Sequence, residues 1–187
     1  MKRITRITIL SLGALAAAAS AQTSIDTVPA SAPQKLAGQV RHELLMMPWY
    51  GVFDHIMFRV DGRAVTLMGA VTRPALRDEA GRRVKAVEGV ETVDNQIRVL
   101  PLSPYDDRIR LASWHTIYSH PALNRYALGA QPGIRLLVEN GALTLEGVVG
   151  SKLECELAGI LANGIPGVFV VKNKLAVEGA APKGKKS

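Results

Sequence analysis

An internal repeat constrains this chain more than any other feature of its sequence. Residues 56–99 align with residues 134–177 at a constant offset of 78 and without a gap. By direct count, 14 of the 44 aligned positions are identical, and they fall on glycines and on alternating apolar sites. A repeat of this length predicts two copies of one supersecondary unit that pack on each other.

Each copy begins with a predicted hairpin. Apolar residues alternate through residues 56–60 and 64–71, which is the period of a half-buried strand. Asp61-Gly62 lies between the two segments, and Asn140-Gly141 takes this place in the second copy. Such pairs close tight hairpins, so the same two strands are expected again 78 positions later.

The period then becomes helical, with Leu76, Ala80 and Val84 four residues apart. Gly89 follows this helix, and alternation resumes in a third strand over residues 93–99. Upstream of each hairpin, residues 39–47 and 112–120 are predicted to form a further helix. The fold class is therefore α+β: two tandem αββαβ modules, each a three-stranded mixed sheet covered on one face by two helices.

The N-terminus has the pattern of a secretion signal. Lys2, Arg3 and Arg6 precede an apolar run over residues 7–18, and Ala19-Ser20-Ala21 supplies the small-x-small pattern cut by signal peptidase. The run is shorter than the roughly 20 residues of a membrane-spanning helix, although an uncleaved N-terminal anchor remains the alternative. We expect cleavage after Ala21, export to the periplasm and no transmembrane segment.

These patterns divide the chain into six parts. They are a signal peptide (1–21), a flexible leader (22–34), module 1 (35–100), a linker (101–105), module 2 (106–177) and a disordered basic tail (178–187). Removing the three positive charges of the signal peptide lowers the formal net charge from +7 to +4, and three of the remaining lysines lie in the last five residues. The folded body is nearly neutral, which argues against a nucleic-acid partner.

The duplicated pattern resembles the BON-domain family of bacterial osmotically inducible and nodulation-type proteins. The resemblance rests on Asp61-Gly62, Thr66-Leu67, Gly69, Gly89-Val90, Val93 and Asn95, together with their partners in the second copy. It implies a non-catalytic envelope module that is associated with phospholipid binding, osmotic stress and support of other exported proteins. In similar two-copy proteins, anionic lipid is thought to meet the first helix of the second copy, which corresponds here to residues 113–120.

Aromatic residues gather between the first helix and the first strand of each copy. Trp114 and Tyr118 are four residues apart and share a helical face, and Arg125 and Tyr126 follow them. Trp and Tyr combine an apolar ring with a polar atom, which suits membrane headgroups. We expect these four residues to form a lipid- or partner-binding patch; the alternative is that they seal the core or the seam between the modules. Trp49, Tyr50, Phe53 and Phe58 form a similar group in the first copy.

Signals for catalysis are missing from the sequence. His115 and His120 are five residues apart rather than the four that suit a zinc pair on a helix, and no nucleophile elbow or phosphate loop is present. We expect no enzyme activity, no cofactor and no metal. Cys155 is expected to be a buried, inert thiol, and Asn95 and Asn173 are expected to be partly buried amides that bond to backbone near Gly89 and Gly167.

The expected function is a periplasmic binding protein that contacts an anionic phospholipid surface or an envelope protein reversibly. The alternative is a chaperone-like or purely structural periplasmic protein that has no defined ligand site. The sequence leaves the oligomeric state open.

Overall fold

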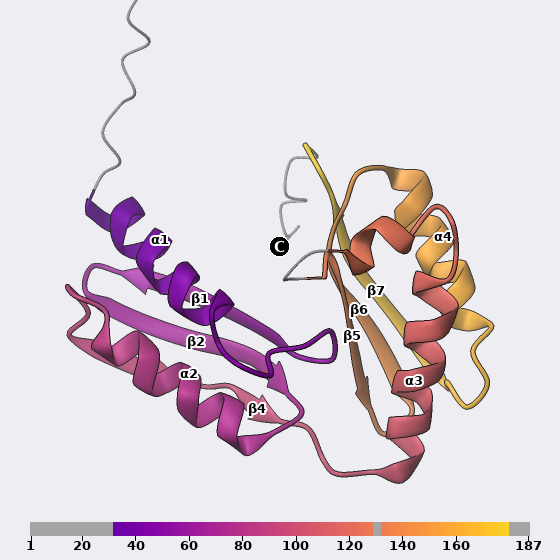
Figure 1. The fold of residues 1–187 in the computed structure, drawn as a ribbon, viewed down its shortest axis with the longest axis horizontal. Helices are drawn as coiled ribbons and strands as arrows, with labels where there is room; N and C mark the ends of the chain where they lie inside the picture. The colour runs from indigo at the N-terminus through magenta and orange to yellow at the C-terminus, as the bar shows by residue number, and fades with distance from the viewer. Residues whose placement is uncertain (1–31, 129–131, 180–187) are drawn as a thin grey trace, which may run out of the picture.

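The computed structural model describes residues 32–128 and 132–179. The expected signal peptide, its cleavage site, most of the leader and most of the tail lie outside these residues. Two αββαβ modules are present, as predicted, and in each one both helices lie on the same face of the sheet (Figure 1).

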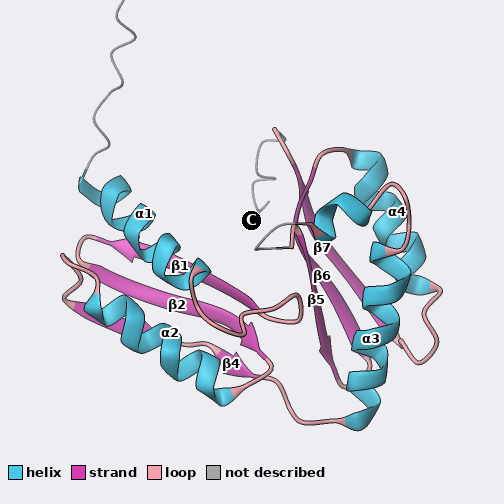
Figure 2. Ribbon diagram, viewed as in Figure 1, coloured by secondary structure: helices cyan, strands magenta, loops and turns pink. Residues whose placement is uncertain are grey.

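The first module consists of α1 (Ala32–Leu45), β1 (His55–Asp61), β2 (Ala64–Val71), α2 (Pro74–Ala86), β3 (Thr92–Asn95) and β4 (Arg98–Val99). The second consists of α3 (Pro104–Tyr118), the short 3-10 helix η1 (Asn124–Ala127), β5 (Ile134–Glu139), β6 (Ala142–Val149), α4 (Lys152–Asn163) and β7 (Val170–Val177). In both sheets the second strand is central (Figure 2). It pairs antiparallel with the strand before it and parallel with the strand or strands after it, so both sheets are mixed.

Three boundaries differ from the sequence-based expectation. The strand predicted over residues 93–99 is divided into β3 and β4, with residues 96 and 97 between them. Helix α1 begins at Ala32, inside the expected leader. Helix α3 begins at Pro104, inside the expected linker, because Ser103 caps it by accepting a hydrogen bond from Asp106 N (3.2 Å).

The hairpins also explain two of the repeated glycines. Gly69 and Gly147 have φ values of +118° and +129°, and a Cβ atom at these positions would lie 2.1 Å from the backbone oxygens of His55 and Gly133, respectively. Only glycine fits this geometry. The first turn differs by one residue from the expectation, since Asp61 pairs with Ala64 and leaves Gly62-Arg63 as the loop.

Each module has its own apolar core. In the first, Val65 and Leu67 of β2 are at most 1% exposed and pack with residues of α1 and α2. In the second, Leu143 and Leu145 occupy the matching positions of β6 and pack with residues of α3 and α4. The alternating pattern read from the sequence is thus the helix-facing side of each sheet.

A segment that we name the seam loop, residues 48–54, joins the two modules. Its Val52 and Phe53 pack against the core of the second module, and the Val52 carbonyl accepts a hydrogen bond from Leu136 N of β5 (2.9 Å). Two side-chain contacts also cross between the modules: His55 is hydrogen-bonded to Glu146, and Arg98 forms an ion pair with Glu139 (3.1 Å). The first module therefore covers part of the free edge of the second sheet, which would otherwise expose unpaired backbone groups.

Candidate functional site: the outer face of α3

Helix α3 presents an apolar and basic row to solvent. The inward side holds Ile109, Ser113 and Ile117, which are at most 2% exposed. On the outward side, Leu111 is 65% exposed and Trp114 is 47% exposed. Arg108 and His115 are also exposed, and each lies one turn from Leu111 on the same side of the helix. An exposed apolar pair of this kind, next to the positive charge of Arg108, suits contact with a partner rather than with water alone.

Tyr118 is buried and packs against the Trp114 ring, so it is not part of the exposed surface. Its ring meets Trp114 edge to face, with ring centroids 6.3 Å apart. Tyr118 is only 6% exposed, and its hydroxyl donates a hydrogen bond to the Ile134 carbonyl of β5. Burial raises the pKa of Tyr118, against the opposing charge of Arg135, so the phenol stays protonated and keeps donating.

Arg125 and Tyr126 lie on η1 and bind the start of α4. Arg125 donates to Tyr126 (2.8 Å) and pairs with Glu154, while the Tyr126 hydroxyl donates to the same carboxylate (3.0 Å) and accepts from Gly150 N (2.7 Å). Desolvation by itself raises the pKa of Glu154, but hydrogen bonds from Ser151 and Tyr126 and the charge of Arg125 outweigh it and lower this pKa. The Arg125 side chain remains 58% exposed.

The structure thus arranges the four predicted site residues in two pairs. Trp114 and Tyr118 are in ring contact on α3, and Arg125 and Tyr126 are in contact on η1. The neighbouring arginines differ. Arg110 is 6% exposed and turned inward, where it donates to the Val138 carbonyl (2.8 Å), whereas Arg108 is exposed and lies over the Tyr105 ring at 5.7 Å. Arg108 is therefore the arginine of α3 that can meet an anion in solvent.

Sequence reasoning missed Leu111, Leu102 and Arg73 as parts of this region. Leu102 is 94% exposed, and with Leu111, Arg73 and Phe53 it lines a shallow groove of about 330 Å³ between the modules. A helical wheel over 104–118 would have placed Leu111 beside Trp114. Arg73 belongs to the other module, so no pattern in the sequence around α3 could have predicted that it lines this groove.

The aromatic residues that cluster in the first copy have different locations: some lie at the contact between the modules, and one lies at the surface. Tyr50 lies under the guanidinium of Arg135 (4.7 Å), and Phe53 packs against the second core. Trp49 instead points outward, 79% exposed, with Arg73 at 5.9 Å from its ring. Its φ of +65° is unusual for a bulky residue.

Other sequence-derived candidates have structural roles. Asn95 and Asn173 are exposed rather than partly buried, and each donates to a backbone carbonyl of the preceding helix of its own module, Arg77 O and Cys155 O, rather than to the glycine loops. Cys155 is partly buried and its thiol lies 3.7 Å from the Leu175 carbonyl. Within residues 32–128 and 132–179, no group of three or more His, Cys, Asp or Glu is placed to hold a metal ion. In the same ranges, no helix is long and apolar enough to cross a bilayer.

Comparison with known proteins identifies the repeated unit. The family model described as BON domain matches residues 34–101 and 122–179. No curated protein matches the chain. Two solved structures of CdsD, a structural protein of the type III secretion system of Chlamydia trachomatis, align with 16% and 18% identity and a TM-score of 0.29 each; the first is of the CdsD C-terminal domain. The alignments cover 76% and 77% of this chain but only 64% and 61% of those chains.

Proposed function

This chain belongs to the BON-domain family, and on that premise we propose that it is a non-catalytic envelope protein whose second module binds anionic phospholipid surfaces through the outer face of α3. Trp114 is the central contact and Tyr118 holds it in place. Arg125 and Tyr126 form the adjoining contact on η1. The observation that carries the proposal is the exposed pair Leu111 and Trp114 in line with Arg108.

The side chains of this surface differ in the part of a lipid that each can contact. The indole of Trp114 and the side chain of Leu111 enter the headgroup boundary, while Arg108 meets lipid phosphate. Each basic residue near an anionic membrane contributes about 1 kcal/mol, which salt weakens. Arg125 can contact phosphate from its exposed side while it keeps its bond to Glu154. With so few contacts the attachment is reversible.

Co-sedimentation with vesicles tests this function. Purified protein is mixed with vesicles of phosphatidylcholine alone or with phosphatidylglycerol, over salt concentrations from about 0.01 M to about 1 M. We expect binding only to the anionic vesicles, and less of it as salt rises. Trp114→Ala with Arg108→Ala should abolish binding, and Trp114→Ala with Arg125→Ala should do the same, with unchanged circular dichroism.

The matched control is Ile160→Ala on α4, which removes an apolar side chain that is more exposed than Trp114 (70% against 47%) from the other helix of the module. It should bind vesicles as the wild type does. Normal binding by both folded double variants would refute the α3 surface. Loss of fold in these variants would instead assign Trp114 to the core.

A protein partner is the second candidate, and helix α4 favours it. Leu153 and Ile160, seven residues apart, are 74% and 70% exposed. The matching helix of the first module carries Ala75 and the ion-paired Arg82 there, so the fold itself does not require apolar residues. Chaperone-like or structural contact through α4 predicts that Ile160→Ala, and not Trp114→Ala, weakens capture of an envelope protein.

The proposed location is the periplasm. It is supported by the basic start and short apolar run before Ala21. Mass spectrometry of the protein from its source cell should find Gln22 as the N-terminal residue, and fractionation should recover the protein outside the cytoplasm. A cytosolic pool that retains residues 1–21 would contradict this location.

A further inference from the structure

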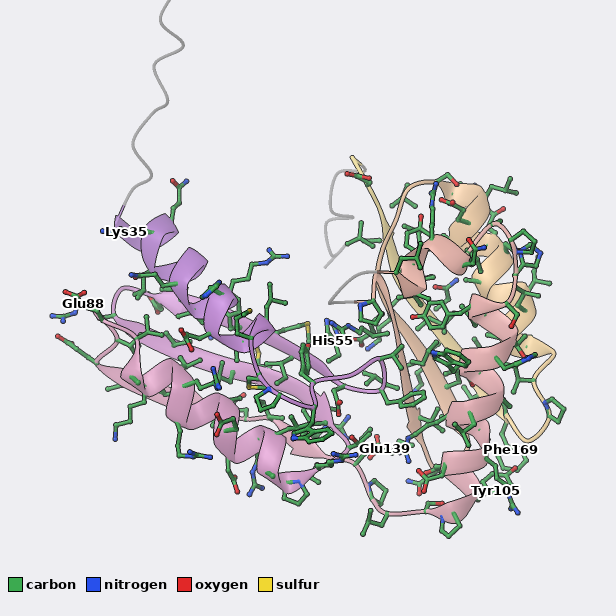
Figure 3. The ribbon with its side chains drawn as sticks, viewed as in Figure 1. Lys35, His55, Glu88, Tyr105, Glu139 and Phe169 are labelled. Carbon is green, nitrogen blue, oxygen red and sulfur yellow. The ribbon has the colours of Figure 1, made fainter. Side chains whose placement is uncertain are left out.

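A second, separate cleft lies between the two modules, and Tyr50 of the seam loop is one of the residues that line it. Its volume is about 620 Å³, within the 300–1,000 Å³ typical of small-molecule sites, which often lie between domains. The C-terminal half of α1 and the edge strand β1 form one wall. The starts of β5 and the ends of β6 form the other, and His55 lies between them (Figure 3).

The walls of this cleft are largely apolar and incompletely covered. Ile56, Met57 and Phe58 line it from β1, and Leu45 and Val148 line it from α1 and β6. Leu45, Met57 and Val148 are 36%, 44% and 52% exposed. A ligand that covers such side chains removes apolar surface from water, which stabilises the complex.

The ionisable side chains that line the cleft are basic or phenolic. Arg41 enters from α1, His55 from β1 and Arg135 from β5, and none of the thirteen lining residues is acidic. His55 contacts Glu146, and Arg135 donates to the Gly51 carbonyl (2.6 Å) and lies over Tyr50. Arg41 is exposed at the rim, where it can turn toward a ligand without leaving a buried site.

We propose that this cleft binds a fatty acid, with its single acyl chain along Met57, Phe58 and Val148 and its carboxylate at Arg41. Apolar walls with basic residues at the rim select an amphiphile with a negative end. Guanidinium and carboxylate match in geometry and can form two parallel hydrogen bonds. A small-molecule volume suits one chain better than the two chains of a phospholipid. This site does not depend on membrane binding by α3.

A fluorescence titration with 11-(dansylamino)undecanoic acid tests the site in purified protein. We expect saturable binding of one probe per chain, displaced by dodecanoic acid but not by dodecan-1-ol. Arg41→Glu should weaken binding about tenfold or more. The matched control is Lys35→Glu, which makes the same change of charge on the same helix outside the cleft and should leave affinity unchanged. Val148→Asp places a carboxylate on the apolar wall and should also weaken binding about tenfold.

Several outcomes would overturn the assignment. Equal weakening by Arg41→Glu and Lys35→Glu would show attraction by overall charge alone. If dodecan-1-ol displaces the probe as effectively as dodecanoic acid, the carboxylate has no role in binding. If oleoyl lysophosphatidylglycerol displaces the probe more strongly than the acid, the cleft binds a lipid phosphate rather than a carboxylate. Loss of probe binding in Trp114→Ala would move the site to α3. Because Arg41 is an exposed helical residue, its variant should stay folded, and melting curves check this.

Discussion

Asn95 and Asn173 make the same hydrogen bonds at the same position of the two modules. Each donates its amide to a helix carbonyl, 2.8 Å and 2.7 Å away, and accepts from the backbone N–H two residues later. Each amide also lies against a glycine in the middle of that helix, Gly81 or Gly159. One interaction therefore explains two identities of the repeat, the asparagine and the helical glycine.

This arrangement predicts opposite effects for two glycine substitutions. Gly38→Ala in α1 meets no atom within 4 Å and should stabilise the protein by about 1 kcal/mol through helix propensity. Gly81→Ala would place its Cβ 2.9 Å from Asn95 Nδ2 and should destabilise by about 1 kcal/mol through overpacking. Urea unfolding measures both. Adding Asn95→Ala should restore part of the loss, and a stabilised Gly81→Ala variant would contradict the packing argument.

A substitution at Tyr118 can distinguish support of the Trp114 ring from direct contact with lipid. Tyr118→Phe leaves the ring beneath Trp114 but removes the donor to the Ile134 carbonyl. An unsatisfied buried carbonyl costs about 1–3 kcal/mol, so the melting temperature should fall. Binding to anionic vesicles should remain. A variant with normal melting and lost vesicle binding would mean that the hydroxyl meets lipid directly.

At the scale of elements, Asp54 fixes the seam loop. It is 3% exposed and accepts hydrogen bonds from Gly51 N (3.0 Å), Thr72 N (2.7 Å) and Thr72 Oγ1 (2.8 Å). The loop in turn presents Val52 and Phe53 to the second module. The buried carboxylate of Asp54, which belongs to the first module, thus holds in place the loop that contacts the second module.

Asp54→Ala should therefore release the loop. Leaving the three donors without this partner is expected to destabilise the first module by about 3 kcal/mol or more. Hydrogen exchange should also become faster at Leu136 N, whose acceptor is the Val52 carbonyl. Exchange at Leu145 in the centre of β6 is the internal control. Unchanged protection at Leu136 would show that the loop holds without Asp54.

The elements that the sequence predicted well are those that the repeat duplicates. Strand β2 has the predicted bounds, and the turn at Asn140-Gly141 forms as expected, with both residues at positive φ. The seam loop could not be predicted, because residues 48–54 lie outside the gapless alignment and their contacts are with the other module. For the same reason the ion pair of Arg125 with Glu154, which lies 29 positions further along the chain, could not be predicted.

At the scale of the whole molecule, one carboxylate links both modules. Glu146 lies opposite Arg135 on the neighbouring strand, on the sheet face that no helix covers. It pairs with Lys174 of β7 (3.2 Å) and with His55 of the first module. Its side chain is 12% exposed. Desolvation alone would raise its pKa, but the hydrogen bonds and charges of His55 and Lys174 outweigh this and lower the pKa of Glu146.

Stability of the assembled protein should therefore depend on pH through Glu146. Because the folded-state pKa lies below the unfolded value, the carboxylate stabilises the fold above its ordinary pKa range, and this contribution is lost as pH falls through the folded-state pKa. At pH 7, Glu146→Gln should lower the free energy of unfolding by on the order of 1 kcal/mol, or about 2–4 °C in melting temperature. This gap from the wild type should persist down to about pH 5 and close toward pH 3. Glu91→Gln, which breaks a solvent-exposed pair with Arg63, is the matched control and should cost little at any pH. A gap that stays constant down to pH 3 would mean that the glutamate acts through packing rather than through its charge.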